Sequence, residues 1–317
     1  MIRRPTALAV TAITAIALAT PAAAGPTAPD PSALPLGDPP AVTWQAGTSL
    51  HLPDGTTVKL PLGKAGAHYE VLGRRGGEWL VVIPGYDAKV LGVKGSKVRT
   101  VWKHVHDESA TSYTLSAGGT LVAEWNYDRA GTTHAVVFDL TGKVLSERSW
   151  GGSMSLLDFV GDTMLISARK RSFTWAVPGK PVEAGPGGYY GDLAADLIFV
   201  NQRHDFAGPT SLSEPGVPAW SSDTFSPGAL SPDGQYVAGW TYTHQLKLQV
   251  RKLVDGTVQP VPGFRFPFDS AMRWEPDGSL LVEVRSGGSR TVVRCSVAGS
   301  CTRATDQLKG QHLGFPG

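Results

Sequence analysis

One arrangement of residues recurs about every forty positions and constrains the fold more than any other feature of this chain. Each copy has a turn rich in Gly or Asp-Gly, a short apolar strand, a second turn and a further strand. In the two clearest copies, Ser-Pro-Asp-Gly at 231–234 and Glu-Pro-Asp-Gly at 275–278 precede the apolar strand. Because one such unit cannot bury both faces of its own sheet, stacked copies must supply a shared core.

The second strand of each copy is a run of β-branched, aromatic and other apolar residues between turn residues, which is typical of short β-strands. Six copies align on this strand, at 78–83, 120–125, 163–167, 197–200, 235–240 and 279–284. Pro presets φ and Gly supplies a positive φ in the preceding turns, so we expect antiparallel hairpins. Outside residues 1–24 no segment shows an apolar period of 3.6 residues, and we expect almost no helix.

These copies predict an all-β fold, a β-propeller of six or seven four-stranded antiparallel blades. A hairpin predicted at 48–60 would close the ring beside the last blade and remove its exposed edges. Six copies plus this N-terminal hairpin favour seven blades, one of them incomplete. The copy at 197–220 is expected to be the weakest, because Pro209, Pro215 and Pro218 interrupt its third and fourth strands.

The Ser-Pro-Asp-Gly turn with its apolar strand, together with a strand that ends in Asp139-Leu140-Thr141-Gly142, resembles the WD40-like propeller repeats of exported bacterial proteins. The resemblance covers about residues 45–305. The copies lack the Gly-His and Trp-Asp pairs of eukaryotic WD40 repeats. The resemblance implies a propeller fold and implies no activity.

The N-terminus has the features of a removable secretory signal. Arg3 and Arg4 precede an uncharged Ala-rich segment, and the three Ala residues at 22–24 fit a signal-peptidase site. A retained membrane anchor is the alternative, but the apolar run is shorter than the ~20 residues that span a bilayer. We therefore predict a signal at 1–24, a flexible Pro- and Ala-rich tether at 25–40, one propeller domain at 41–317, and secretion to the extracellular space or the cell envelope.

The charge balance excludes some partners. The chain has 29 Lys and Arg residues, two of them in the signal, and 27 Asp and Glu residues. The mature chain is therefore formally neutral and has no basic run of the kind that binds nucleic acid. We expect a monomer with no nucleic-acid partner and no membrane insertion after signal cleavage.

Cys295 and Cys301 are the two cysteines of the chain, and they bracket a predicted turn in the last copy. In an exported chain this placement predicts a disulfide across a hairpin. A redox-active pair is the alternative, but the spacing is not Cys-x-x-Cys.

The sequence contains no nucleophile-elbow, zinc-protease, phosphate-loop or EF-hand motif. His104 and His106 would lie on one side of an extended segment, where a metal site is conceivable. We favour a solvated loop between blades there, and we expect no metal and no cofactor.

Propeller geometry indicates one candidate binding surface. If the Pro-Asp-Gly turns join first and second strands on one face, the loops after the second strands and those between blades share the opposite face. These loops are rich in Arg and aromatic residues, which dominate recognition surfaces. The candidate binding residues are Tyr127, Arg129, Arg169, Arg171, Arg203, His204, Asp205, Tyr242, His244, Arg265 and Phe266.

We therefore interpret the chain as a secreted, non-catalytic scaffold that binds a protein or glycan partner through this loop face. The alternative is a propeller-type glycan hydrolase or lyase with acid and base residues at the channel mouth. These residues would come from Asp107, Glu108, Asp128, Asp205 and Asp269, assisted by His204 or His244. An enzyme needs two or three such groups in one pocket with shifted pKa values, whereas a binding face spreads its anchors along a rim.

Overall fold

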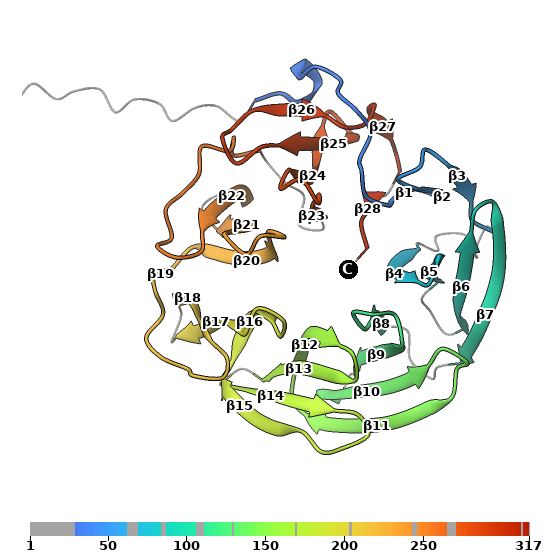
Figure 1. Ribbon diagram of the computed structural model, residues 1–317, viewed down its shortest axis with the longest axis vertical. Coiled ribbons are helices and arrows are strands. Elements are labelled where there is room, and N and C mark those ends of the chain that lie inside the picture. Colours follow the sequence, from blue (N-terminus) through green and yellow to red (C-terminus); the bar gives the residue numbers. More distant parts are fainter. Residues whose placement is uncertain are drawn as a thin grey trace, which may run out of the picture.

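The computed structural model of the chain describes residues 29–61, 69–83, 87–105, 111–128, 130–168, 170–202, 205–242, 246–264, 271–311 and 313–316. These residues form seven small antiparallel sheets around a central channel, which is the architecture of a seven-bladed β-propeller (Figure 1). The one helical element among them is the single-turn 3-10 helix η1 (Pro31–Ala33). The all-β propeller predicted from the repeats is confirmed.

Blades 1 to 3 each have four strands, with the first strand innermost and the fourth outermost. Blade 1 contains β4 (Glu70–Arg75), β5 (Glu78–Ile83), β6 (Asp87–Lys94) and β7 (Lys97–Val105). Blade 2 contains β8 (Thr111–Leu115), β9 (Leu121–Tyr127), β10 (Thr132–Asp139) and β11 (Val144–Gly151). Blade 3 contains β12 (Met154–Val160), β13 (Thr163–Ala168), β14 (Arg171–Ala176) and β15 (Val182–Pro186).

Blades 4 to 6 follow the same order with shorter outer strands. Blade 4 contains β16 (Gly188–Asp192), β17 (Leu197–Gln202), β18 (Asp205–Ser211) and β19 (Ser221–Ser222). Blade 5 contains β20 (Phe225–Leu230), β21 (Tyr236–Tyr242) and β22 (Leu246–Lys252). Blade 6 contains β23 (Met272–Trp274), β24 (Leu280–Ser286), β25 (Ser289–Cys295) and β26 (Cys301–Arg303), and β27 (Leu308–Lys309) also pairs with β25.

Blade 7 combines both ends of the described chain. Its innermost strand is β28 (Leu313–Gly314), which pairs with β1 (Trp44–Ala46), followed outward by β2 (Ser49–His51) and β3 (Thr57–Lys59). The predicted hairpin at 48–60 corresponds to β2 and β3, so the expectation that an N-terminal hairpin helps to close the ring is confirmed. Two strands that we did not predict, β1 and β28, lie on the inner side of this hairpin and complete the blade.

The blade with three strands is blade 5, whereas the copy at 197–220, which we expected to be the weakest, keeps four. In blade 5 the fourth strand is reduced to an isolated bridge between Arg251 and Val258. Blade 4 keeps all four strands although Pro209 lies within β18, because the register between β17 and β18 shifts next to Pro209. The outer strand of blade 4 is nevertheless only two residues long, after a loop that holds the other two prolines.

The core consists of seven apolar clusters, and each cluster lies between two consecutive blades. Period-2 alternation in the second strands explains this division. In β13, for example, Met164 and Ile166 pack toward blade 2, whereas Leu165 packs toward blade 4. Each sheet therefore sends successive side chains to opposite neighbours, and no blade buries its own faces.

A tryptophan of one blade packs against a glycine turn of the next. A Cβ at Gly142 would lie 2.9 Å from Cβ of Trp102, and a Cβ at Gly256 would lie 2.7 Å from the ring of Trp220. The indole N–H of Trp220 also donates to the carbonyl of Leu253, at 2.8 Å. Glycine is required in these turns both for its positive φ and for the close approach of the indole.

The described part of the predicted tether, residues 29–40, runs along the outer edge of blade 6 (Figure 1). Leu36 forms a parallel bridge with Arg303 of β26. The guanidinium of Arg294 forms an ion pair with the buried Glu275 and also donates to the carbonyls of Asp38 and Pro39, at 2.8 and 2.9 Å. Blade 6 thus gains contacts from residues that precede Pro40.

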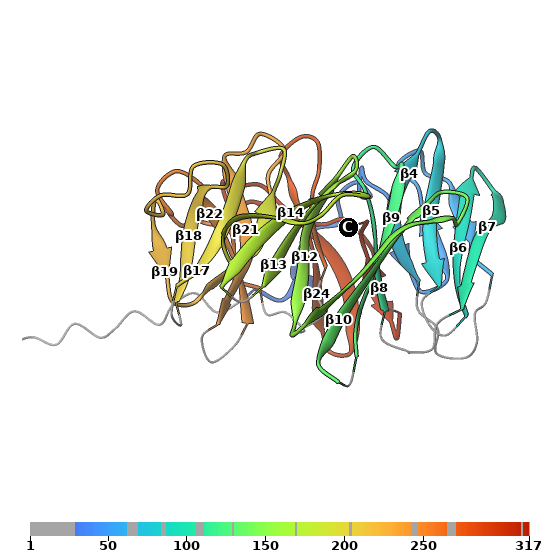
Figure 2. The same cartoon turned by 90° about the horizontal axis from the view of Figure 1, so that it is seen from below.

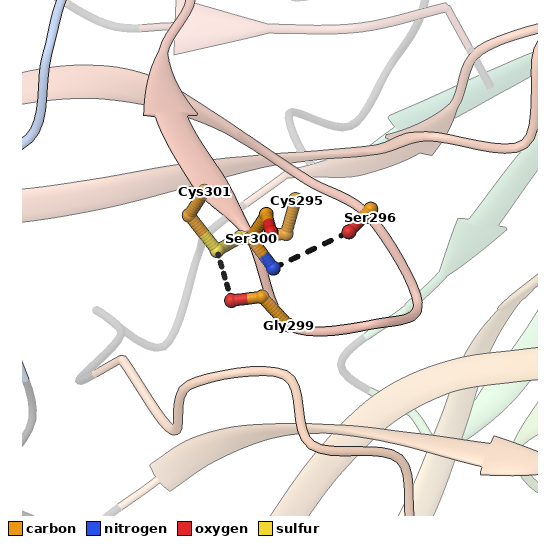
Figure 3. The surroundings of a disulfide bond; sticks show 5 residues. All are labelled: Cys295, Ser296, Gly299, Ser300 and Cys301. Carbon is orange, nitrogen blue, oxygen red and sulfur yellow. Dashed lines mark hydrogen bonds between the residues drawn. A yellow bond between two sulfur atoms is a disulfide. The ribbon is translucent and has the colours of Figure 1, made fainter.

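Cys295 and Cys301 form a disulfide across the turn between β25 and β26, where they are paired in register (Figure 3). The backbone N–H of Ser300 donates to the hydroxyl of Ser296 within the same turn, at 3.3 Å. The predicted structural disulfide is confirmed, and it holds the outer half of blade 6.

The indole–glycine contact can be tested with Gly256→Ala and its matched control Gly234→Ala. The two glycines have nearly the same φ, 71° and 68°, but a Cβ at Gly234 meets nothing within 4 Å. Both variants should lose roughly 1 kcal/mol to backbone strain, and Gly256→Ala should lose a further ~1–3 kcal/mol by displacing Trp220. Chemical denaturation of both variants measures the difference, and equal losses would contradict the packing role.

Candidate functional site

The blades present two different faces, which Figure 2 shows from the side. In blades 1 to 6 the turns from first to second strand and from third to fourth strand lie together, and we call this side the turn face. The loops from second to third strand and the connections between blades lie on the opposite side, the loop face. The Pro-Asp-Gly turns at 232–234 and 276–278 join β20 to β21 and β23 to β24, so they lie on the turn face as expected.

Two of the candidate binding residues have described side chains, and both lie on the loop face. Tyr127, at the end of β9, is 51% exposed. Arg171, at the start of β14, is exposed and pairs with Glu183 at 3.0 Å. Arg129, Arg169, Arg203, His204, His244, Arg265 and Phe266 lie outside the described residues, as do the side chains of Asp205 and Tyr242. The binding role of this face stays a prediction.

Among the acids considered for an enzyme, Asp128 has a described side chain. Its carboxylate accepts from the ring of His134 at 3.0 Å and from the backbone N–H of Thr132 at 2.8 Å. These hydrogen bonds, led by the one from His134, hold the pKa of Asp128 below its usual range. Asp128 therefore stabilises the loop after β9 as a carboxylate, which is the opposite of what a proton donor needs. Asp107, Glu108 and Asp269 lie outside the described residues.

The described side chains do not include those of His104 and His106, which the sequence analysis considered as metal ligands. Within the described part, no group of three or more His, Cys, Asp or Glu side chains could hold a metal ion. The same residues contain no helix long and apolar enough to cross a membrane.

The innermost strands carry a polar cluster at the turn-face end of the channel, which the sequence analysis did not identify. Asp158 of β12 accepts from the backbone N–H of Leu193 at 2.7 Å, and burial raises the pKa of Asp158. The hydroxyl of Tyr190 of β16 accepts from the backbone N–H of Leu230 at 3.1 Å, and burial raises its pKa to about 12. Arg273 of β23 donates to the carbonyl of Pro316 at 3.3 Å, and burial lowers its pKa.

These channel groups mainly join neighbouring blades. Asp158 connects blade 3 to the turn of blade 4, and Tyr190 connects blade 4 to blade 5. The indole N–H groups of Trp125 and Trp274 act in the same way, since they donate to the carbonyls of Met154 and Ala229 in adjacent blades, at 2.9 and 3.1 Å. Packing between blades accounts for these tryptophans. Each bond also satisfies a polar group that burial would otherwise penalise.

One buried carboxyl in blade 2 has a strongly shifted pKa. Glu124 of β9 is 4% exposed, and burial raises its pKa to about 7, although a hydrogen bond with Tyr113 opposes the shift. Burial and the nearby Glu124 also raise the pKa of Tyr113 above its usual range. Tyr113 packs in the cluster between blades 1 and 2, so this pair belongs to the blade interface.

The described surface has a pocket of about 540 Å³ on the turn face between blades 4 and 5. Its lining residues are Leu197, Pro209, Thr210, Ser211, Ala219, Gly234, Gln235, Lys252, Leu253 and Val254. The sequence analysis placed the binding surface on the other face and missed this pocket, because its residues come from two blades.

The walls of this pocket are firmly held. Trp220 lies behind its rim and is fixed by the hydrogen bond to Leu253, by contact with Gly256 and by the guanidinium of Arg251, which lies 5.2 Å from the ring centre. The loop at 212–219 is anchored at its start, where Ser211 and Ser213 donate to the carboxylate of Asp196 at 2.6 and 2.8 Å. The pocket is therefore preformed.

Comparison with known proteins supports the fold. A candidate 6-phosphogluconolactonase from Bacteroides uniformis matches with a TM-score of 0.56 and 14% identity, over 86% of this chain and 98% of that protein. A protein of unknown function from Desulfotomaculum acetoxidans matches with a TM-score of 0.55 and 13% identity, over 85% and 96%. The chain has a WD40-like β-propeller fold.

One further similar structure is a longer protein, and comparisons of sequence find no match. TolB from Acinetobacter baumannii matches with a TM-score of 0.49 and 11% identity over 84% of this chain, which spans 61% of the length of that protein. No known family model and no curated protein sequence matches the propeller. At these identities the similar structures establish the fold and leave the activity to be argued from the propeller's own residues.

The shifted pKa of Glu124 predicts how stability depends on pH. Because the folded state holds a proton on Glu124 up to about pH 7 while the unfolded chain releases it near pH 4.5, the folded state loses stability as the pH rises through this window. The Glu124→Gln side chain cannot ionise, so the variant does not lose stability in this pH window. The variant should be more stable than the wild type by ~2–3 kcal/mol at pH 8 and by much less at pH 4.5.

Urea denaturation at the two pH values measures this effect. Glu183→Gln is the matched control, because Glu183 lies on the surface in an exposed pair with Arg171 and such pairs contribute little to stability. A difference between Glu124→Gln and the wild type that is the same at both pH values would exclude the proposed protonation.

Proposed function

We propose that this propeller is an exported, non-catalytic scaffold that binds a partner protein at the pocket between blades 4 and 5. The observation that carries the proposal is the preformed pocket of about 540 Å³ on the turn face. Its volume falls within the ~300–1,000 Å³ typical of binding pockets. The surrounding blades are rigid, so an inserted side chain would be bound without a large ordering cost in the pocket.

The chemistry of the lining supports binding over catalysis. The described residues that line the pocket are four aliphatic residues, one proline, one glycine, three neutral polar residues and one Lys. The described acids with raised pKa values are the buried Glu124 and the half-buried Asp158, which belong to blades 2 and 3 and are engaged in contacts between strands or blades. A glycan hydrolase or lyase would require such groups to converge in one pocket.

A protein segment suits the pocket better than a glycan. Carbohydrates present mostly hydroxyl groups, and those would be left unpaired against Leu197, Leu253 and Val254. An aliphatic or aromatic side chain of a partner protein would instead bury apolar surface there. The exposed Val254, which lines the pocket at 67% exposure, and Val217 on the neighbouring loop at 95%, extend the apolar surface around it.

The proposed site of action is outside the cytoplasm. The N-terminal sequence fits a secretory signal, and the disulfide between Cys295 and Cys301 is of the kind that persists in oxidising compartments. The loop face with Tyr127 and Arg171, which the sequence analysis predicted as the binding surface, is a second contact surface in this proposal.

Site-specific photo-crosslinking tests the proposed surface. A benzophenone amino acid introduced at Val254 should give discrete crosslinked products in a cell-envelope extract. The same probe at Val144, which is 46% exposed on blade 2, is the control. We expect products from position 254 that are lost when Ala219→Arg fills the pocket mouth, and few or none from position 144. Equal products from both positions, or none from position 254, would contradict the proposal.

A further inference from the structure

The turns around the pocket carry an unusual charge distribution. Four turn-face segments contain or directly adjoin its lining residues, namely 193–196 and 212–220 of blade 4 and 231–235 and 253–257 of blade 5. Each contains one acidic residue, and none contains Lys or Arg. The acidic residues are Asp196, Glu214, Asp233 and Asp255. The one cation that lines the pocket is Lys252.

Hydrogen bonds hold three of these acids in their ionised form. Asp196 accepts from Ser211 and Ser213, Asp233 accepts from Ser231 and Gln235, and Asp255 accepts from the backbone N–H of Thr257. These hydrogen bonds hold the pKa of each of the three carboxyls below its usual range. The acids are therefore charged throughout the physiological pH range, and their positions are fixed by the turns.

The turn face differs in charge from one blade to another, although single Asp residues also occur in turns of blades 7, 2 and 6. The corresponding turns of blade 1 are flanked by Arg74, Arg75, Lys94 and Lys97 and are basic. Since the mature chain is formally neutral, the difference reflects where charges are placed on the ring and not an excess of acid. An apolar pocket with a ring of negative charge attracts positively charged partners and disfavours acidic ones.

We propose that the occupant of this pocket is a basic segment of a partner protein, in which one large apolar side chain is flanked by Lys or Arg. The apolar side chain fills the space lined by Leu197, Leu253 and Val254, and the cations lie against the acidic rim. This inference rests on the proposed function and adds the chemistry of the partner. The apolar anchor supplies most of the affinity, whereas the rim supplies the association rate and the selectivity.

Selection from a random peptide library tests the inference without a known partner. The probe is a display library of 12-residue peptides, selected on the immobilised protein at low ionic strength. We expect the selected peptides to carry net positive charge around an apolar residue, and their binding to fall at least ~10-fold in Val254→Glu. Their affinity should also fall as salt screens the rim.

A matched pair of triple variants isolates the role of charge. Glu214→Gln, Asp233→Asn and Asp255→Asn together remove three rim charges while the Asn side chains keep an oxygen for the turn hydrogen bonds. The control combines Asp54→Asn, Asp139→Asn and Asp277→Asn, whose carboxylates accept equivalent hydrogen bonds in turns of blades 7, 2 and 6. We expect the rim variant to weaken the selected peptides at least ~5-fold and the control to leave them unchanged.

The outcomes separate this inference from the proposed function. One outcome is that the selected peptides depend on Val254 for binding but are neutral or acidic, and another is that they bind the rim variant as well as the control variant. Either result would show that the partner is not basic, while the pocket would still bind a protein segment. If no peptide is selected whose binding depends on Val254, both proposals fail. Circular dichroism and thermal unfolding of each variant confirm that the propeller is intact.

Discussion

Each blade of this protein has apolar side chains on both faces of its sheet, and the structure depends on covering every face with the neighbouring blade. The seven core clusters lie at the seven interfaces between blades, so the ring itself is the hydrophobic core. Polar groups follow the same plan. Asp158, Tyr190, Trp125 and Trp274 each form a hydrogen bond to the backbone of an adjacent blade. A side chain at such an interface therefore affects two sheets at once.

The candidate site lies between blades 4 and 5, where the described side chains form a cluster of four buried residues, Leu197, Phe199, Phe225 and Val237. Proline and small residues, among them Pro209, Ala219 and Gly234, occupy positions at the turn-face end of the interface between blades 4 and 5, and they leave a pocket that neither sheet fills. Trp220 of blade 4 packs against Gly256 of blade 5 next to this pocket. Pro209, one of the prolines that made this copy irregular in sequence, thus lines the candidate binding surface.

Local patterns were sufficient to predict the blades, but the pocket required the three-dimensional arrangement. The alternation of apolar residues and the Pro-Asp-Gly turns predicted the six second strands, the antiparallel pairing and the ring, and the cysteine spacing predicted the disulfide. The short strands β1 and β28 carry too few residues for a pattern to be recognised. The lining of the pocket combines Leu197 with Leu253 and Val254, which are distant in sequence and are ordinary apolar residues by themselves. The acidic rim likewise consists of four turn residues that the sequence distributes over two repeats.

The pairing of Gln45 with Gly314 has a consequence for how the molecule reaches its native state. Three strands of blade 7 leave the ribosome early, but its innermost strand emerges about 270 residues later, so the cluster that it shares with blade 6 forms at the end. Contacts between such distant residues are slow to form. The ring therefore closes only after residues 313–314 have been synthesised. Once β28 has paired with β1, the two ends of the described chain lie in one sheet, and the ring can open only if this pair separates.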